Sequence, residues 1–343
     1  MTDAVTLAGP TLMARETAES PAVVERQLRA NHAALREVGE QLRAAPPRYV
    51  ATCARGTSDH VATYAKYLIE TMAGVPVMSA APSVASLYGK PLQADGAWVI
   101  AISQSGRSPD LLDTVGGLAS GGARTIALVN DESSPLAESA DIVLPLHAGP
   151  ERAVAATKSC IASLAGVAAL VAGWTGDEAL GEALDALPAM LAGALALDWS
   201  PARVALVEAT QMFVLGRGLG FGVAQEAALK LKETCGIQAE PFSSAEVRHG
   251  PMRIVEPGFP ILGFAQGDSA GSDVVATAAE FGARGALVRL ATKTGDLPVV
   301  AGHPALEPIA MLMSFYPMVE ALSRDRGHDP DSPPSLAKVT CTR

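Results

Sequence analysis

Residues Phe213–Glu233 read FVLGRGLGFGVAQEAALKLKE and contain one complete strand–turn–helix unit. Phe213–Leu215 is a short apolar run, which is typical of a buried strand. A glycine-rich turn follows it and opens a helix that carries Lys230, Lys232 and Glu233 near its end. A strand that leads through a tight turn into a helix is the building unit of a parallel sheet covered by helices. The stretch therefore predicts an α/β fold.

The same unit recurs along the chain. Further short buried strands are expected at Tyr49–Cys53, Trp98–Ile102, Thr125–Val129, Asp141–Leu144, Ile261–Phe264 and Ala286–Leu290. Segments with helical patterns separate these runs, as in domains whose parallel strands are buried on both faces. We therefore expect parallel sheets with helices on both sides.

The second half of the sequence repeats the first with an offset of about 160 residues. The matching positions are Arg55-Gly56 with Arg217-Gly218, Val61-Ala62 with Val223-Ala224, Gln104 with Gln266, and Gly122-Ala123-Arg124 with Gly282-Ala283-Arg284. A nearly constant offset across several positions is stronger than any single match. It predicts two similar α/β domains, at residues 46–195 and 196–325.

Residues 1–45 and 326–343 lie outside these two domains. The first segment contains one amphipathic helix at residues 20–43, with Ser20 as its cap and Pro21 at its first helical position. The second segment, RGHDPDSPPSLAKVTCTR, is polar and rich in proline. It is interpreted either as a disordered end or as an ordered tail that places Lys338 over a site.

The composition, 49% hydrophobic and 18% charged residues, is that of a globular protein with a large core. The net charge of -10 and the lack of a basic block argue against nucleic acid as a partner. The four widely spaced cysteines favour reduced thiols in the cytoplasm and disfavour a metal site. The N-terminus lacks a signal-peptide pattern. The most apolar run, Cys160–Trp174, is shorter than the roughly 20 residues of a membrane span and is predicted to be a buried core helix.

A polar loop, Ser103-Gln104-Ser105-Gly106-Arg107-Ser108, directly follows the predicted strand Trp98–Ile102. Ligands bind at the carboxyl ends of parallel strands, and hydroxyl groups together with the N–H groups of a helix start suit a phosphate. The candidate phosphate-binding residues are Ser103, Gln104, Ser105 and Ser108. The alternative is a serine-rich turn that only caps the helix beginning near Pro109.

Thr57 and Ser58 follow the strand Tyr49–Cys53 in the same way and are further candidates. Ser58 is interpreted either as a phosphate or hydroxyl contact or as a helix N-cap. The glycines between positions 216 and 222 do not form a GxGxxG motif, because position 221 is phenylalanine. No nucleotide cofactor is therefore expected.

Lys230 and Glu233 lie three residues apart, on one face of their helix. On their own they are better explained as a solvated ion-pair face of the helix. His249 follows in a polar loop before Gly250-Pro251, and histidine is the side chain most easily poised near neutral pH. A carboxylate, an amine and an imidazole near a glycine-rich turn suit proton transfer on a small anionic substrate. A structural histidine is the alternative.

These motifs together resemble the sugar isomerase (SIS) family. Within it, the chain is similar to the isomerase half of glucosamine-6-phosphate synthase and to single-chain glucosamine-6-phosphate deaminases. The resemblance covers residues 12–343 and rests on the segments ISQSG, EAALKLKE, AEVRHGP and LAKVT. The fold that it implies is two tandem three-layer αβα domains with parallel sheets, preceded by the helical arm and followed by a tail that belongs to the active site.

The resemblance also implies roles for individual residues. Ser58, Ser103, Gln104, Ser105 and Ser108 would hold the phosphate and the sugar hydroxyls. Glu233 would move a proton between C1 and C2, with Lys230 supporting it, and Lys338 would contact the open-chain carbonyl end. His249 would open the sugar ring in the neighbouring subunit of a homodimer. The implied reaction converts glucosamine 6-phosphate to fructose 6-phosphate and ammonia, and it needs no metal or organic cofactor.

Two departures from the family pattern bear on this expectation. Ala156 stands where the synthase has a serine, which puts one sugar-hydroxyl contact in doubt. No cysteine-dependent glutaminase segment precedes residue 12, which favours free ammonia as product or substrate. Alternatives are a glutaminase-less aminotransferase-type synthase and an isomerase of another phosphosugar, such as galactosamine 6-phosphate or a fructose-amine adduct. A phosphosugar sensor is the non-enzyme alternative, disfavoured because one helix replaces the usual DNA-binding segment.

Overall fold

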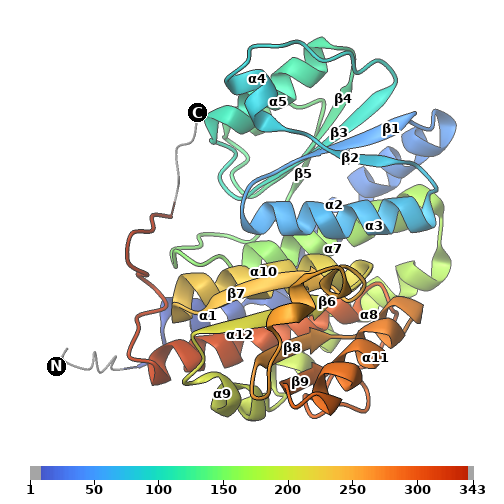
Figure 1. Cartoon of the computed structure of the whole chain (residues 1–343). Coiled ribbons are helices and arrows are strands. Elements are labelled where there is room, and N and C mark those ends of the chain that lie inside the picture. Colours follow the sequence, from blue (N-terminus) through green and yellow to red (C-terminus); the bar gives the residue numbers. More distant parts are fainter. Residues whose placement is uncertain (1–8, 339–343) are drawn as a thin grey trace. The chain divides into compact units, whose positions relative to one another are not determined.

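The computed structural model describes residues 9–338, which divide between two compact units. The first unit combines the chain up to Pro21 with Glu151–Ile161 and Ala186–Lys338. The second unit comprises Ala22–Pro150 and Ala162–Asp185. Each unit is built on one parallel sheet (Figure 1). The units are not contiguous in sequence, because two helices in the middle of the chain are divided between them.

The second unit contains a five-stranded parallel sheet with the order β2-β1-β3-β4-β5. Its strands are β1 (Tyr49–Cys53), β2 (Val77–Ser79), β3 (Ala97–Ser103), β4 (Arg124–Val129) and β5 (Ile142–Pro145). Its helices are α2 (Ser20–Ala44), α3 (Thr57–Met72), α4 (Pro82–Ser86), α5 (Pro109–Ser120) and α6 (Pro135–Ser139), with most of α7 (Lys158–Thr175) and the start of α8 (Glu178–Leu195).

Alternate residues along these strands face opposite helical layers. Ala51 of β1 and Val99 of β3 belong to one buried cluster with Leu111 and Val115 of α5. The crossovers through α3 and through α5 run in opposite directions across the sheet. Because such crossovers are right-handed, α3 and α5 cover opposite faces. The second unit is therefore a three-layer αβα arrangement.

The first unit contains a four-stranded parallel sheet with the order β7-β6-β8-β9. Its strands are β6 (Gln211–Gly216), β7 (Gln238–Ser243), β8 (Pro260–Phe264) and β9 (Leu287–Ala291). Its helices are α1 (Leu12–Ala18), α9 (Ser200–Leu206), α10 (Leu219–Cys235), α11 (Ser269–Ala283) and α12 (Glu307–Asp325), with the short 3-10 turns η1 (Glu246–Arg248) and η2 (Pro251–Ile254).

The first unit has the same layering. Ile261 of β8 clusters with Phe281 of α11 on one face of the sheet. Phe264, three residues along the strand, points to the other face, where its ring lies 6.0 Å from that of Trp199 and 6.1 Å from that of Phe315 of α12. The two-residue period of a strand therefore separates the α11 layer from the layer that contains α9 and α12. The predicted fold class, two three-layer αβα units with parallel sheets, is confirmed.

The internal repeat is visible in the backbone. Gly56 and Gly218 are the N-caps of α3 and α10, with φ/ψ of 55°/-130° and 58°/-128°. The positive φ explains why both positions are glycine. One predicted match was misaligned: Gly122 has φ 101° and precedes β4, and its counterpart before β9 is Gly285, with φ 91°. The predicted match of Gly122 with Gly282 reflected identical residue types and not equivalent positions in the structure.

The predicted N-terminal helix corresponds to α2, but the prediction that Ser20 caps this helix is wrong. The Ser20 hydroxyl is buried without a hydrogen-bond partner. The physical reason is that α1 ends at Ala18, so α2 follows another helix instead of starting from an open loop.

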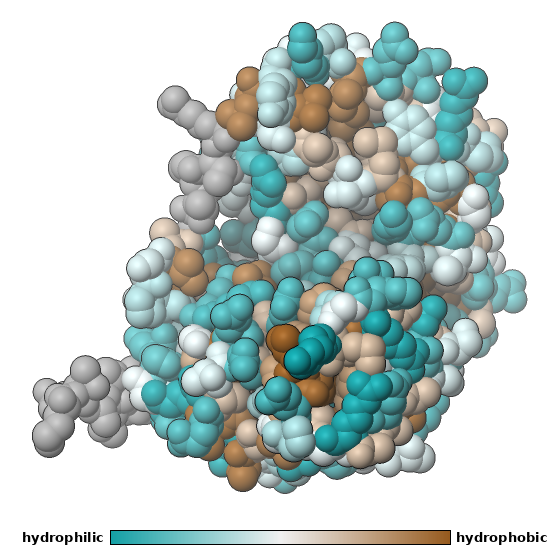
Figure 2. Space-filling view, in the orientation of Figure 1, coloured by the Kyte–Doolittle hydropathy of each residue, from teal (hydrophilic) through white to brown (hydrophobic). Residues whose placement is uncertain are grey.

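Helix α7 matches the predicted core helix. By length and composition it could cross a membrane, and the bent pair α8–α9 passes the same test if counted as one span. Inside the protein 89% of the α7 window is buried, as the sequence predicted. On the face shown in Figure 2, hydrophobic residues form small groups among hydrophilic ones. Large exposed apolar side chains in the described chain include Leu87 and Tyr88.

Candidate active site

The predicted phosphate loop joins β3 to α5. All residues of β3 are buried, so the chain leaves the sheet at Ser103 and turns at once. The Ser103 hydroxyl oxygen accepts the Gly106 N–H at 3.0 Å. Gly106 has φ 62° and lies against the side chain of Ser134, so a larger residue would both strain the backbone and clash. The loop is therefore a tight, defined turn.

Ser108 is the N-cap residue of α5, but its side chain makes no capping hydrogen bond. The interpretation of this serine as a simple cap is therefore wrong. The helix start offers fewer amides than the sequence suggested, because Pro109 has no N–H and the Leu111 N–H is bonded to Asp110 Oδ1 at 2.9 Å. The start of α5 therefore offers few backbone donors to an anion, and the hydroxyl and amide side chains of the loop are the candidate donors there.

Arg55 and Asp110 connect the first two loops of this sheet. Arg55 Nε donates to Asp110 Oδ2 at 2.8 Å, and the aspartate side chain is fully buried while the arginine is half exposed. Gly56 is the N-cap of α3, so Ser58 lies in the first turn and is not the cap that was considered. The equivalent pair in the other sheet joins Arg217 to Asp273 at 2.6 Å.

The two loops lie where an open α/β sheet binds ligands. β1 and β3 are parallel neighbours, so their carboxyl ends meet at one edge of the sheet. The chain runs from β1 outward to β2 on one side and from β3 to β4 on the other. Such a change of direction leaves a crevice between the two following loops. Residues 54–58 and 104–108 flank it, which brings Thr57 and Ser58 to the same edge as Ser105 and Ser108.

In the first unit, α10 carries the predicted acid–base residues. Lys230 Nζ lies 2.7 Å from Glu233 Oε2 and 3.2 Å from Glu226 Oε1. The lysine side chain is fully buried, Glu226 is 1% exposed and Glu233 is 21% exposed. The alternative of a solvated surface pair is therefore wrong for Lys230. The arrangement ends in one carboxylate that solvent or a substrate can reach.

Burial and charge act against each other on Lys230. Desolvation alone would lower its pKa, but the carboxylates of Glu226 and Glu233 raise the pKa above the ordinary lysine value. Lys230 is therefore a permanent ammonium near neutral pH. It supplies a positive charge and a hydrogen bond to Glu233.

His249 follows the turn η1 in the first unit. Its backbone N–H is bonded to Glu246 O at 2.9 Å, and its side chain is exposed. Within residues 9–338, neither His249 nor Lys338 is hydrogen-bonded to Glu233. The structure thus joins Lys230 to Glu233 and leaves the imidazole on the surface.

The C-terminal tail is ordered through Lys338. Asp331 accepts the N–H groups of Leu12 and Met13 at 2.6 and 2.8 Å, so it caps α1. Lys338 Nζ contacts the buried carboxylate of Glu151 at 3.1 Å. The part of the tail that the structure describes is therefore ordered, and the placement of Lys338 over a site stays a prediction.

Glu151 is a residue that the sequence analysis missed. Its carboxylate accepts the N–H groups of Thr157 and Ser159 and the Ser159 hydroxyl, at 2.6–3.1 Å. Burial would raise its pKa, but the Lys338 charge and these donors hold the pKa below the usual glutamate value. Glu151 thereby connects the segment around Ala156 with the tail. A single glutamate after a proline gives no sequence pattern that would mark it.

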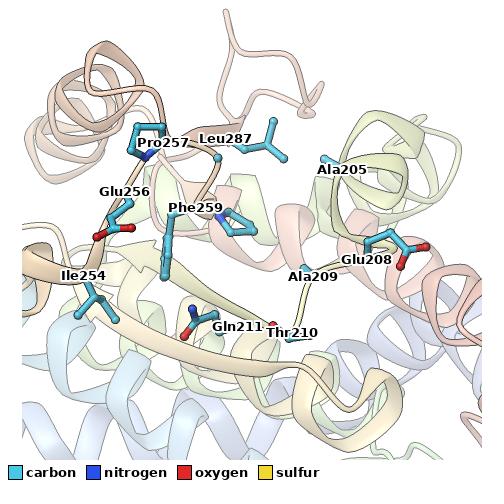
Figure 3. Close-up of a pocket in the computed structure, with 12 residues that line it drawn as sticks. Ala205, Glu208, Ala209, Thr210, Gln211, Ile254, Glu256, Pro257, Phe259 and Leu287 are labelled. Atoms are coloured by element: carbon cyan, nitrogen blue, oxygen red, sulfur yellow. The ribbon is translucent and has the colours of Figure 1, made fainter.

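The structure also contains a pocket that is not the predicted site. It has a volume of about 420 Å³ and is lined by Glu208, Gln211, Glu256, Pro260 and neighbouring residues (Figure 3). Gln211 and Pro260 begin their strands, so the pocket lies at the amino edge of the sheet, opposite the loops that follow β6 and β8. Its two carboxylates have the wrong charge for a phosphate. Within residues 9–338, no group of three His, Cys, Asp or Glu side chains is arranged to hold a metal.

The sequence matches the SIS domain family over residues 45–173 and 205–307. It is 35% identical over 308 residues to the glutamine–fructose-6-phosphate aminotransferase (isomerizing) of Aeropyrum pernix, covering 83% of this chain and 49% of that protein. The chain spans about half the length of the curated relatives it matches.

Two solved structures are similar over nearly the whole chain. One, from Silicibacter pomeroyi and provisionally named a phosphosugar isomerase, has 45% identity and a TM-score of 0.89, covering 94% of this chain and all of that one. The C-terminal domain of glucosamine-fructose-6-phosphate aminotransferase from Francisella tularensis has 26% identity and a TM-score of 0.84, covering 96% of this chain and all of that one. This chain therefore belongs to the SIS domain family.

Proposed function

We propose that the protein is an aldose–ketose isomerase of an amino-sugar phosphate that releases ammonia. The proposed reaction converts glucosamine 6-phosphate and water to fructose 6-phosphate and ammonia. The observation that carries it is the partly exposed Glu233 carboxylate, held at 2.7 Å by the buried ammonium of Lys230. Similarity to an aminotransferase named for fructose 6-phosphate supports the choice of substrate class.

In the proposed mechanism, Glu233 takes the proton from C2 of the open-chain aldose while an acid protonates O1. The resulting enolamine receives the proton at C1, which gives a ketimine at C2. Addition of water and loss of ammonia then give the ketose. Lys230 stabilises the ionised form of Glu233 before the first transfer and after the second, because a nearby positive charge favours a carboxylate. General base catalysis of this kind contributes typically 10²- to 10⁴-fold.

The remaining predicted residues complete the proposal. Ser58, Ser103, Gln104, Ser105 and Ser108, with Thr57 beside them, bind the phosphate and sugar hydroxyls. Lys338 contacts the carbonyl end of the open sugar. His249 acts on the ring oxygen in the neighbouring subunit of a homodimer, and its exposed position directly after η1 supports a role outside its own unit's core. The buried free thiols of Cys53, Cys160 and Cys235 support a reducing, cytoplasmic location.

The second candidate is the reverse direction, amination of fructose 6-phosphate with ammonia or with nitrogen from a separate glutaminase. Its support is specific: the relative from Aeropyrum pernix, which is similar to this chain, is named as an aminotransferase. The same proton transfer by Glu233 serves both directions. Only the nitrogen chemistry distinguishes them.

The test is an incubation of the purified protein with glucosamine 6-phosphate, measuring ammonia and fructose 6-phosphate together. Equal amounts of both are expected. Glu233→Gln should reduce turnover by about 10²- to 10⁴-fold and keep substrate binding. The control is Glu240→Gln, the same chemical change at an exposed position of β7, which should leave turnover unchanged.

The other outcomes separate the alternatives. Glucosamine 6-phosphate formed from fructose 6-phosphate and ammonium, without the breakdown reaction, would replace the deaminase with the synthase. Turnover of galactosamine 6-phosphate or of a fructose-amine adduct alone would keep the isomerase and change its substrate. Tight binding of phosphosugars with no turnover of any would contradict the enzyme proposal and favour a sensor.

A further inference from the structure

Behind Lys230 lies a second buried hydrogen-bond partner that the sequence did not suggest. The Tyr316 hydroxyl of α12 donates to Glu226 Oε1 at 3.2 Å, the same oxygen that lies 3.2 Å from Lys230 Nζ. Tyr316 and Lys230 are fully buried, and Glu226 is almost so. A continuous chain of contacts therefore runs from α12 through Glu226 and Lys230 to Glu233.

The charges of Glu226, Lys230 and Glu233 explain why a further hydrogen-bond donor such as the Tyr316 hydroxyl is needed beside them. One ammonium serves two carboxylates, so the buried group has one excess negative charge if both acids are ionised. Burying a carboxylate is costly unless donors surround it. The Tyr316 hydroxyl gives Glu226 a donor besides the ammonium. Lys230 can then lie closer to Glu233, at 2.7 Å, than to Glu226, at 3.2 Å.

The surroundings of Tyr316 keep it in the donating form. Burial raises the pKa of its hydroxyl well above the ordinary value, and burial likewise raises the pKa of the Cys160 thiol. Both groups are therefore neutral at physiological pH. The Tyr316 hydroxyl therefore keeps the proton that it donates to Glu226.

We propose that Tyr316 is a positioning residue for the base Glu233, acting through Glu226 and Lys230. The inference rests on the proposed role of Glu233. Without the hydroxyl, Glu226 draws Lys230 toward itself, and Glu233 loses part of the partner that orients it and stabilises its charge. The proton transfer slows, and phosphate binding, which belongs to loops of the other unit, is unaffected.

The test is Tyr316→Phe, which removes one oxygen and leaves the ring in place. We expect kcat to fall by about tenfold, as for a lost hydrogen bond to a charged group, with KM changed by less than about twofold. The control is Ser314→Ala, two residues away on α12. The Ser314 hydroxyl is also buried but bonds to the backbone oxygens of Ala194 and Ala310. The Ser314→Ala substitution should therefore leave kcat unchanged.

A double-mutant cycle tests the route. In a Glu226→Gln background, Tyr316→Phe should have little further effect on kcat, because both changes break the same chain. Additive effects would show that Tyr316 acts by general packing and would overturn the inference. Equal losses of kcat in Tyr316→Phe and Ser314→Ala would do the same.

A crystal structure of Tyr316→Phe gives a readout that does not depend on the reaction. The contact between Lys230 and Glu233 should lengthen in this variant and stay unchanged in Ser314→Ala. An unchanged contact in both would overturn the inference, whatever the substrate is. An inactive wild type together with the lengthened contact would instead contradict the proposed function and leave the positioning role supported.

Discussion

Lys230 and Glu233 show what a single residue gains from its surroundings. As an i,i+3 pair on a surface they would contribute only a few tenths of a kcal/mol, about 0.2–0.5. The structure buries the lysine completely and places two carboxylates beside it. The ammonium of Lys230 is therefore fixed next to Glu233. Glu233, with 21% of its side chain exposed, is the accessible end. The chemistry that we propose depends on this difference in burial.

Glu151 gives a pH prediction at the same scale. Its pKa is lowered in the folded protein, so its stabilising contribution is complete above the ordinary glutamate pKa of about 4.3 and is lost as the pH falls through the folded value. Lys338 is one cause of the lowering. Lys338→Met should therefore reduce the free energy of unfolding near neutral pH, and the difference from wild type should shrink as the pH falls below the ordinary glutamate pKa.

Urea unfolding across that pH range measures this difference. Lys66→Met, a change at an exposed lysine of α3, is the control and should show little difference at any pH. A difference between wild type and Lys338→Met that does not vary with pH would contradict the proposed pairing in solution.

At the scale of elements, a residue at the start of a helix can serve either to cap the helix or to bind a ligand, and the start of α5 allows the two roles to be tested separately. Ser108 is the N-cap residue but makes no capping bond, whereas Asp177 Oδ1 accepts the Leu180 N–H at 2.8 Å at the start of α8. Ser108→Ala should change stability by less than about 0.5 kcal/mol and weaken binding of fructose 6-phosphate. Asp177→Ala should cost about 1 kcal/mol and leave binding intact.

Thermal unfolding and calorimetric titration of both variants check this prediction. A loss of stability in Ser108→Ala with unchanged affinity would return this serine to a structural role.

The strands differ in how well the sequence predicts them, and the difference follows from their position in the sheet. β1, β3 and β4 were predicted within one residue at each end, because each is a continuous apolar run buried on both faces. β7 was missed because it is an edge strand and reads QAEPFS. An edge strand needs hydrogen bonds on one side only and therefore tolerates Pro241 and exposed Glu240. β2 is too short for a pattern.

At the scale of the whole molecule, the proposed dimer makes a quantitative prediction. Co-expressed Glu233→Gln and His249→Ala subunits form mixed dimers that contain one intact site if His249 acts in the neighbouring subunit. Because random pairing makes half of the dimers mixed, about a quarter of wild-type turnover should return. Each variant expressed alone should stay inactive. No recovery in the mixture would place both residues in one subunit's site.

The amino-acid sequence by itself determined the fold class, the repeat and the residues of the two candidate loops. These follow from local patterns: apolar runs for buried strands, and Gly56 and Gly218 for turns that need a positive φ. Only the tertiary structure decided that Lys230 is buried, that Ser108 does not cap its helix, that Glu151 contacts Lys338, and that Tyr316 is hydrogen-bonded to Glu226. Tyr316 lies 90 positions from Glu226, and Glu151 lies 187 positions from Lys338. Burial and long-range hydrogen bonds arise only when distant segments pack, and no local pattern records them.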